Sequence, residues 1–441
     1  MLFVSTLLGG RIQISPWRTL PIDWFVWLIA LAALVVLRRR IAPGSLPLSH
    51  LFEKLRQWFR LPSTKLALHL ALWTRVAIFA GGLLAVNTLG HDLSTGPPPP
   101  NEVAYLPGRW DAGWYVGLAA GGYRWDGRLD RNARIAFFPA YPMSVRAVGR
   151  VLHLPQREPP WLWCGAILST IYFWLALAYL HRLAEMWIGA ARAGPAILIA
   201  ALYPFSFFFG QMYSESLFLL CAVAGTFYVM NGQPARAFWF GLVAGLTRPT
   251  GVLVSLLLIG AALWARRNRP ADARANSSIT TLFAIASPAL GTALYSIYLR
   301  WLTGHWLAWL TAQEGWGRTI QDPMMLVTSV ATSLRAVGLT GYVHARPYDA
   351  INLAAALFAF AMLFLIWRRL GLWMTLFAAA SLLAPLRVGG LVSMERYTAV
   401  IFPMFLAYAT LNRHIVIAWA IVFWRVAVVV RGIVFADRAV F

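Results

Sequence analysis

An acidic residue flanked by aromatic residues lies in the most polar stretch of this sequence. Asp111 belongs to the segment RWDAGWYVGLAAGGYRWDGRLDRNARIAFFPAYP (residues 109–142), directly after Trp110 and shortly before Trp114 and Tyr115. A carboxylate held among aromatic rings has a raised proton affinity and can serve as a general base. The alternative role is a helix N-cap, for which aspartate is among the best residues. We expect Asp111 to be the catalytic residue.

Four further charged residues stand beside apolar runs farther along the chain: Glu215, Arg248, Glu395 and Arg396. Glu215 can contact a substrate hydroxyl or a metal, or it can simply favour the positive end of a helix. An arginine at the position of Arg248 is costly unless it binds a phosphate or pairs with an acid such as Glu215 or Glu395. Glu395 and Arg396 can form a local ion pair or contact the substrate.

Several other kinds of chemistry lack the residues they need. The eight histidines show no metal-ligand spacing such as HExxH, and the two cysteines, Cys164 and Cys221, lie inside apolar runs. The chain has no glycine-rich phosphate loop, nucleophile elbow or Ser/His/Asp arrangement. We therefore predict no metal site and no certain cofactor, while the use of a divalent cation stays open.

The composition is that of a membrane protein. The 441 residues are 60% hydrophobic and only 12% charged, about half the charged fraction of a soluble domain. Apolar runs of spanning length predict a single all-α domain over residues 1–441, a transmembrane bundle of about twelve helices. The predicted spans are 17–37, 66–89, 161–180, 194–210, 213–231, 236–247, 250–265, 279–300, 349–367, 371–386, 396–411 and 414–431.

The arginines predict how the bundle is oriented. Short loops on one side hold clusters such as Arg266–Arg267 and Arg368–Arg369, which places that side in the cytoplasm. Two long external loops then cover about residues 90–160 and 301–348. The first should contain an interfacial helix from Asp111 to Ala120 that ends at Gly121–Gly122. All the candidate residues, and the loop from Trp301 to Arg318, fall on the external side.

The net charge of +22 is spread over many loops. This distribution argues against a nucleic-acid partner, which would need the charge gathered on one module. Most of it follows from the positive-inside bias, and the remainder suits anionic lipid head groups or a substrate phosphate.

Five motifs occur in an order that resembles a known family. They are Trp110-Asp111 with Gly122-Tyr123, Ala136-Phe137-Phe138-Pro139 with Tyr141-Pro142, Tyr213-Ser214-Glu215, Leu246-Thr247-Arg248-Pro249, and Ser393-Met394-Glu395-Arg396-Tyr397 with Phe402-Pro403. Together they resemble the PIG-V family, the second mannosyltransferase of GPI-anchor assembly with its prokaryotic relatives. That family belongs to the GT-C membrane glycosyltransferases. Eukaryotic members tend to carry an acid and a histidine where this chain has Gly113 and Trp114.

The resemblance implies a function and a location. The expected reaction moves a mannose from a polyprenyl-phosphate donor to a lipid-linked or glycan acceptor, with the active site outside the cytoplasm. Asp111 holds the position of the expected base. The compact loops suggest a prokaryotic plasma-membrane protein, which need not make GPI at all; a eukaryotic member would reside in the endoplasmic reticulum membrane.

We expect an inverting transfer, in which one carboxylate takes the acceptor proton while cations hold the leaving phosphate. Arg248 and Arg396 are the candidate phosphate ligands. The remaining candidate substrate-binding residues are Arg109, Trp110, Tyr123, Tyr213, Glu215 and Glu395.

Two other classes of protein remain as alternatives. A lipid or sugar transporter, or a flippase, would also have many spans and intramembrane charges, but it should carry them near the middle of the helices. A non-catalytic scaffold subunit would leave Asp111 and Arg248 pointing away from any cavity.

Overall fold

The computed structural model describes residues 12–15, 18–20, 53, 56–89, 101–125, 127–128, 133–268, 278–318, 320, 322–411, 414–418 and 421–422. Most of the predicted span at 17–37 and most of the one at 414–431 lie outside these residues, so they stay predictions. The other ten predicted spans fall on described segments.

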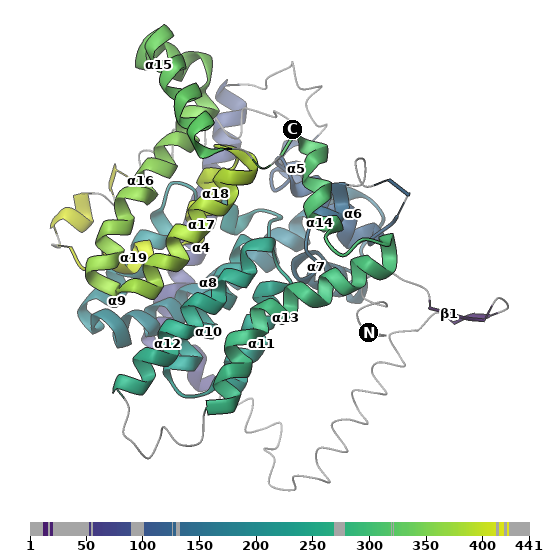
Figure 1. Cartoon of the computed structure of the whole chain (residues 1–441), viewed down its shortest axis with the longest axis horizontal. Coiled ribbons are helices and arrows are strands. Elements are labelled where there is room, and N and C mark those ends of the chain that lie inside the picture. The colour runs from purple at the N-terminus through teal and green to yellow at the C-terminus, as the bar shows by residue number, and fades with distance from the viewer. Residues whose placement is uncertain are drawn as a thin grey trace, which may run out of the picture.

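The described chain is a bundle of helices (Figure 1). Its long helices are α4 (Pro62–Leu89), α8 (Glu158–Ile188), α9 (Ala190–Leu202), α10 (Glu215–Met230), α11 (Pro234–Gly245), α12 (Val254–Asn268), α13 (Ser278–Thr303), α15 (Pro323–Ala345), α16 (Pro347–Leu370) and α17 (Leu372–Gly389). The shorter ones are α5 (Glu102–Tyr105), α6 (Ala112–Gly121), α7 (Ala140–Val151), α14 (Ala308–Thr311), α18 (Met394–Ala399) and α19 (Phe402–Tyr408). Four 3₁₀ turns connect them: η2 (Ala133–Ala136), η3 (Ser206–Gly210), η4 (Pro249–Leu253) and η7 (Ala312–Trp316).

The one small sheet among the described residues lies near the N-terminus. Strands β1 (Ile12–Ser15) and β2 (Arg18–Leu20) form an antiparallel pair with a register shift between Gln13 and Ser15. The sequence did not predict this hairpin.

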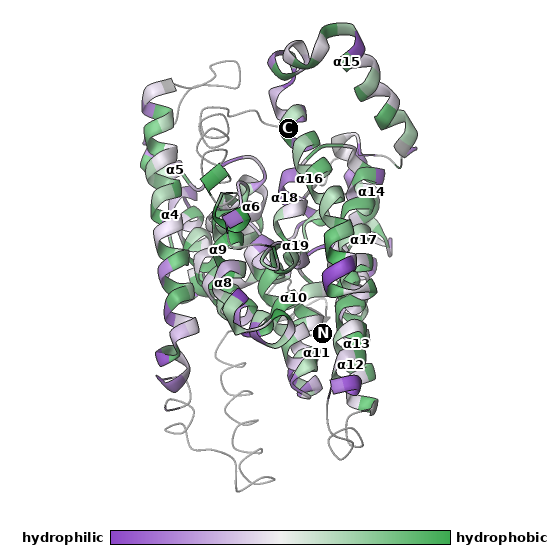
Figure 2. Cartoon of the chain, turned by 90° about the vertical axis from the view of Figure 1, so that its left-hand side faces the viewer, coloured by the Kyte–Doolittle hydropathy of each residue, from purple (hydrophilic) through white to green (hydrophobic). Residues whose placement is uncertain are grey.

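Seven described helices are long and apolar enough to cross a bilayer. They are Pro62–Thr88, Glu158–Ile188, Pro249–Asn268, Ile279–Thr303, Met324–Ala345, Pro347–Leu370 and Leu372–Gly389. Hydrophobic residues run along these helices (Figure 2). A largely helical integral membrane protein is therefore confirmed, whereas the count of about twelve spans is not.

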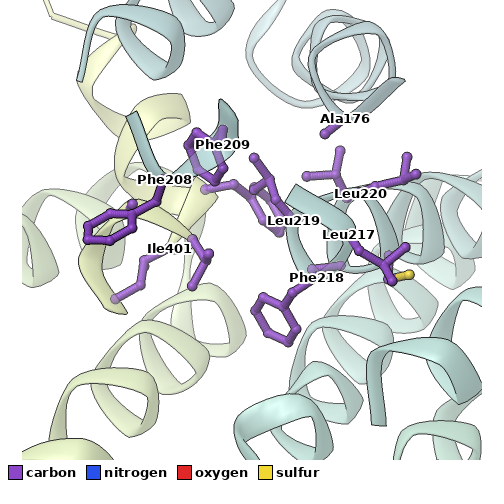
Figure 3. Packing of buried hydrophobic residues seen from close by; sticks show 14 of the residues in the cluster. Ala176, Phe208, Phe209, Leu217, Phe218, Leu219, Leu220 and Ile401 are labelled. Carbon is purple, nitrogen blue, oxygen red and sulfur yellow. The ribbon is translucent and has the colours of Figure 1, made fainter. Parts of the chain in front are cut away.

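The difference in span count comes from short helices. Helices α9, α10 and α11 have 13, 16 and 12 residues, and a bilayer core needs about 20. Helix α10 is buried at every residue except Tyr228 and packs against α8, α11 and α12. A helix that is apolar all round is a core helix, and α10 has that role. Figure 3 shows its residues Leu217–Leu220 packed beside Phe208 and Phe209.

Helix α15 lies within the segment that the sequence placed in the second external loop. It begins at Pro323, where the Asp322 side chain accepts a hydrogen bond from the Met324 N–H (3.0 Å). It bends at Gly338, whose φ of 69° is not helical. The helix projects from the rest of the bundle (Figure 1), and none of its spanning window is buried. Serines, threonines and Arg335 interrupt its apolar pattern, which is why the sequence suggested a loop.

The helix predicted after Asp111 is present. Helix α6 spans Ala112–Gly121 and ends at Gly122, whose φ of 77° suits glycine. Helix α6 packs against α7 and α8, and the turns η2 and η7 contact each other. The contacts with α7 and α8 hold α6 against the bundle.

Candidate active site

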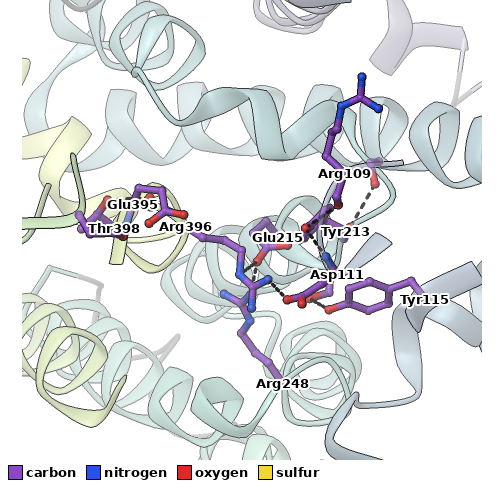
Figure 4. Close-up of polar contacts among 12 residues, drawn as sticks. Arg109, Asp111, Tyr115, Tyr213, Glu215, Arg248, Glu395, Arg396 and Thr398 are labelled. Carbon is purple, nitrogen blue, oxygen red and sulfur yellow. Dashed lines mark hydrogen bonds and ion pairs between the residues drawn. The ribbon is translucent and has the colours of Figure 1, made fainter. Parts of the chain in front are cut away.

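Four charged side chains from distant parts of the chain meet at one end of the bundle. Asp111 precedes α6, Glu215 begins α10, Arg248 lies between α11 and η4, and Arg396 lies in α18. Asp111 and Arg396 are 285 positions apart in the sequence, yet Arg396 Nη1 donates a hydrogen bond to Asp111 Oδ2. Figure 4 shows these side chains pointing toward one another.

Glu215 links the two arginines. Its Oε1 accepts a hydrogen bond from Arg248 Nη2 (2.5 Å) and lies 3.0 Å from Arg396 Nε. The Glu215 side chain is fully buried, and the side chains of Arg248 and Arg396 are 7% and 9% exposed. Buried charges of this kind persist only when they are paired. Glu215 is therefore the acidic partner of Arg248 that the sequence allowed for.

Asp111 is the most exposed member of this charge cluster (Asp111, Glu215, Arg248 and Arg396). Its side chain is 22% exposed. Although Asp111 stands at the N-cap position of α6, its carboxylate makes no capping hydrogen bond. The carboxylate is thus directed to Arg396 and not to the helix.

A cavity of about 740 Å³ opens beside the cluster, with Asp111, Arg248 and Arg396 in its wall. This volume is in the range of small-molecule sites, about 300–1,000 Å³. Aromatic side chains form much of the remaining wall: Trp110, Trp114, Tyr115, Phe137, Phe138, Phe208, Tyr213, Trp309, Tyr348 and Tyr397. A wall that combines charged groups with aromatic rings suits a ligand that has a polar head and an apolar part.

Tyr213 holds the backbone on which Asp111 sits. The Asp111 N–H donates to the Tyr213 hydroxyl (2.9 Å), and that hydroxyl donates to the Arg109 carbonyl (2.9 Å). Between them Trp110 has a φ of 46°, a left-handed conformation that is uncommon for a non-glycine residue. The fully buried Tyr213 thus fixes a strained turn that aims the Asp111 carboxylate.

We predict that Tyr213→Phe reduces the activity of the site by about tenfold or more, because small displacements of a catalytic group are costly. It should also lower stability by about 1–3 kcal/mol, since a buried N–H loses its partner. Turnover and thermal unfolding measure these effects. Tyr228→Phe is the matched control, as it removes a hydroxyl that contacts Tyr179 (2.6 Å) away from the cavity. Equal activity in the two variants would contradict the positioning role of Tyr213.

Glu395 belongs to a separate hydrogen-bonded group. The Tyr348 hydroxyl donates to Glu395 Oε1 (2.8 Å), and the Glu395 N–H donates to Asn352 Oδ1 (3.1 Å). Among the described residues Glu395 forms no ion pair with its neighbour Arg396, which turns to Asp111 and Glu215 instead. Burial raises the pKa of Glu395 to about 7, and the hydrogen bond from Tyr348 only partly opposes that rise.

This raised pKa predicts a pH dependence of stability. Between its ordinary pKa of about 4.5 and the folded value of about 7, Glu395 binds more protons in the folded state than in the unfolded state. Stability should therefore fall as the pH rises through that window. Relative to Glu395→Gln, the wild type should lose thermal stability between about pH 5 and about pH 8. Parallel unfolding profiles for the two proteins would contradict this prediction.

Two predicted substrate-binding residues lie away from the cavity wall. The Arg109 side chain pairs with Glu102 (3.2 Å). Only the Arg109 carbonyl is linked to the site, because it accepts the hydrogen bond from the Tyr213 hydroxyl. The Tyr123 hydroxyl donates to the Phe137 carbonyl (2.5 Å), which secures a residue that does line the cavity. Of the other predicted substrate-binding residues, Trp110, Tyr213 and Glu395 line the cavity, while Glu215 lies behind its wall.

Other wall residues were not predicted from the sequence. Arg318, Gln313 and Trp309 come from the segment between α13 and α15, and Tyr348 comes from the first turn of α16. For Arg318, Gln313 and Trp309, the only indication in the sequence was the prediction that the loop 301–318 lies on the external side. Within the described residues no three His, Cys, Asp or Glu side chains come together as a metal site.

Known proteins share part of this sequence. A family model described as mannosyltransferase (PIG-V) matches residues 104–265, which include Asp111, Glu215 and Arg248. GPI mannosyltransferase pigv-1 of Caenorhabditis elegans is 26% identical over 149 residues, which are 32% of this chain and 21% of that protein. The match thus spans about a fifth of the length of this curated relative.

A solved structure is distantly similar to part of this chain. The crystal structure of the Archaeoglobus fulgidus oligosaccharyltransferase in complex with Zn and sulfate is 13% identical, with a TM-score of 0.40. The alignment covers 80% of this chain and 53% of that one. The sequence match confirms the predicted resemblance over residues 104–265, which match the mannosyltransferase (PIG-V) model.

Proposed function

We propose that this protein is a membrane glycosyltransferase that moves a mannose, or another hexose, from a polyprenyl-phosphate donor to a lipid-linked or glycan acceptor. The family match supports a mannosyltransferase. The observation that carries the proposal is the position of Asp111, a partly exposed carboxylate in the wall of a cavity that also contains arginines and aromatic rings. This is the combination that a sugar attached to a lipid phosphate requires.

The proposed reaction is a single displacement with inversion. The acceptor oxygen forms a bond to the anomeric carbon of the sugar, the bond from that carbon to the phosphate oxygen breaks, and the electron pair stays on the phosphate. Asp111 takes the acceptor proton. Arg396 holds Asp111 Oδ2, and the carboxylate keeps its second oxygen for the acceptor hydroxyl.

The other carboxylates support inversion. A retaining mechanism needs a second carboxylate as nucleophile, about 5 Å from the first. Glu215 is fully buried behind the wall between two arginines, and Glu395 is engaged by Tyr348. Asp111 is thus the carboxylate best placed to act, and no step of the proposal depends on a divalent cation.

The ends of two helices support an extracytoplasmic site. Helices α12 and α16 have their first residues near the cavity, where η4 and Tyr348 contribute to its wall. Their last turns carry Arg266–Arg267 and Arg368–Arg369. Because arginines near span ends favour the cytoplasm, the cavity would face the other side of the membrane. We propose a prokaryotic plasma membrane with the GT-C-type orientation.

A transporter or flippase is the alternative function. It would need charged groups near the middle of spanning helices. Here Glu215 is the first residue of α10, Arg248 lies between α11 and η4, and Arg396 lies in a short helix. This placement of the charge cluster at helix ends favours the enzyme.

The proposal is tested with purified protein in lipid nanodiscs. Labelled polyprenyl-phosphate mannose is supplied with lipid-linked and glycan acceptors, and transfer is measured together with release of polyprenyl phosphate. We expect both products in equal amounts, and none from a nucleotide-activated mannose alone. Transport of the intact donor across vesicles without any transfer would support the flippase instead.

A further inference from the structure

The arginines of the cavity wall differ in how they are neutralised. Arg396 contacts both Asp111 and Glu215, and Arg248 contacts Glu215. Two carboxylates thus balance these two arginines. Arg318 also lines the cavity, but in the described part of the chain no carboxylate lies within ion-pair distance of it.

The backbone around Arg318 places its side chain at the cavity. Gly317, with a φ of 66°, ends η7, and its N–H donates to the Glu314 carbonyl (2.8 Å). The Arg318 N–H donates to the Gln313 carbonyl (3.2 Å), and Nη1 makes a long contact to Gln313 Oε1 (3.4 Å). A neutral amide orients this guanidinium without cancelling its charge.

The end of α17 packs against the Arg318 side chain. A Cβ built on Gly389 would lie 3.6 Å from both Cδ and Nε of Arg318, so the side chain passes along the last residue of that helix. Gly389 itself lines the cavity. The arginine is thus held between η7 and α17 and is half-buried, unlike a solvated arginine on a loop.

The neighbouring Tyr397 responds to the three arginines of the wall. Burial raises the pKa of the Tyr397 hydroxyl. The charges of Arg318, Arg396 and Arg248 together lower it by more, so the Tyr397 pKa lies below its ordinary value. The guanidinium groups therefore act together on one point of the wall, and Arg318 has the largest effect of the three.

We infer that Arg318 binds the donor phosphate and stabilises the charge that grows on it when the sugar leaves. This inference rests on the proposed function and assigns the phosphate to an arginine other than Arg248 and Arg396. A sugar phosphodiester carries one negative charge, and the released monoester carries up to two. The positive charge of Arg318 therefore stabilises the transition state more than the bound donor, and its loss should lower mainly kcat.

The first test is turnover of Arg318→Ala, Arg318→Lys and the control Arg387→Ala. Arg387 is an exposed arginine of α17 that does not line the cavity. We expect Arg318→Ala to lower kcat by about 100-fold, as loss of one preorganised charge donor does. The kcat of Arg318→Lys should be about tenfold higher than that of Arg318→Ala, because lysine keeps the charge but lacks the planar guanidinium. Arg387→Ala should match the wild type.

The second test separates this inference from the proposed function. Binding of undecaprenyl phosphate and of undecaprenol to each protein is compared in nanodiscs, after thermal unfolding has shown that each variant is folded. The wild type should prefer the phosphate, and Arg318→Ala should lose most of that preference. A wild type without any preference would overturn the donor class proposed above. A preference that survives in Arg318→Ala, with normal kcat, would overturn the role of Arg318 alone.

Discussion

Asp111→Asn should reduce sugar transfer by about 100- to 10,000-fold, the usual contribution of a general base. The amide keeps the size of the side chain and an oxygen that can accept the hydrogen bond from Arg396 Nη1. It cannot take up the acceptor proton. Binding of the donor should therefore persist while transfer is lost, which single-turnover kinetics and donor binding measure separately.

Glu102→Gln is the matched control for this variant. Glu102 is an acid of the same external segment that pairs with Arg109 and does not line the cavity. It should transfer sugar at close to the wild-type rate. Normal transfer by Asp111→Asn would reject Asp111 as the base, and loss of donor binding would point to a role in holding the substrate.

Glu215→Gln should have the largest effect on stability. Its carboxylate is fully buried and is the acidic contact that Arg248 and Arg396 share. Removing one partner of a buried ion pair leaves uncompensated charge, which costs about 3–5 kcal/mol. We expect a lower unfolding temperature and a lower yield of folded protein, measured by thermal unfolding in detergent.

Glu395→Gln provides the comparison for Glu215→Gln. Glu395 is also buried, but it accepts its hydrogen bond from a neutral tyrosine and has a pKa near 7. Its replacement should therefore be tolerated far better. If Glu215→Gln unfolded like the wild type and lost only transfer, Glu215 would belong to the substrate contacts and not to the framework.

The sequence predicted the parts of the site that depend on motifs and on helix ends. Asp111, Arg248 and Arg396 were identified because ionisable residues beside apolar runs are costly and need a reason. The prediction that they lie on the external side came from counting spans and arginines. Even so, four of the counted spans, at 194–210, 213–231, 236–247 and 396–411, fall on the short helices α9, α10, α11 and α18 with α19.

The pairing of these residues could not be predicted. Arg396 is adjacent in sequence to Glu395, and a local ion pair was one expectation, yet the fold turns its side chain to Asp111 and Glu215. Which acid pairs with which arginine depends on how α6, α10 and α18 pack, and this packing cannot be predicted from a local sequence pattern. Arg318 was missed for the same reason. It stands out because it lines a cavity formed by segments far apart in the sequence, and no carboxylate of the described residues lies within ion-pair distance of it.

A structure of Asp111→Asn with polyprenyl-phosphate mannose bound, determined by cryo-electron microscopy in nanodiscs, tests the central claim most directly. The account predicts the sugar in the cavity, with its anomeric carbon facing the side chain of residue 111 and its phosphate against Arg318. A donor whose phosphate lies at the opposite end of the bundle, beside Arg266 or Arg368, would contradict it.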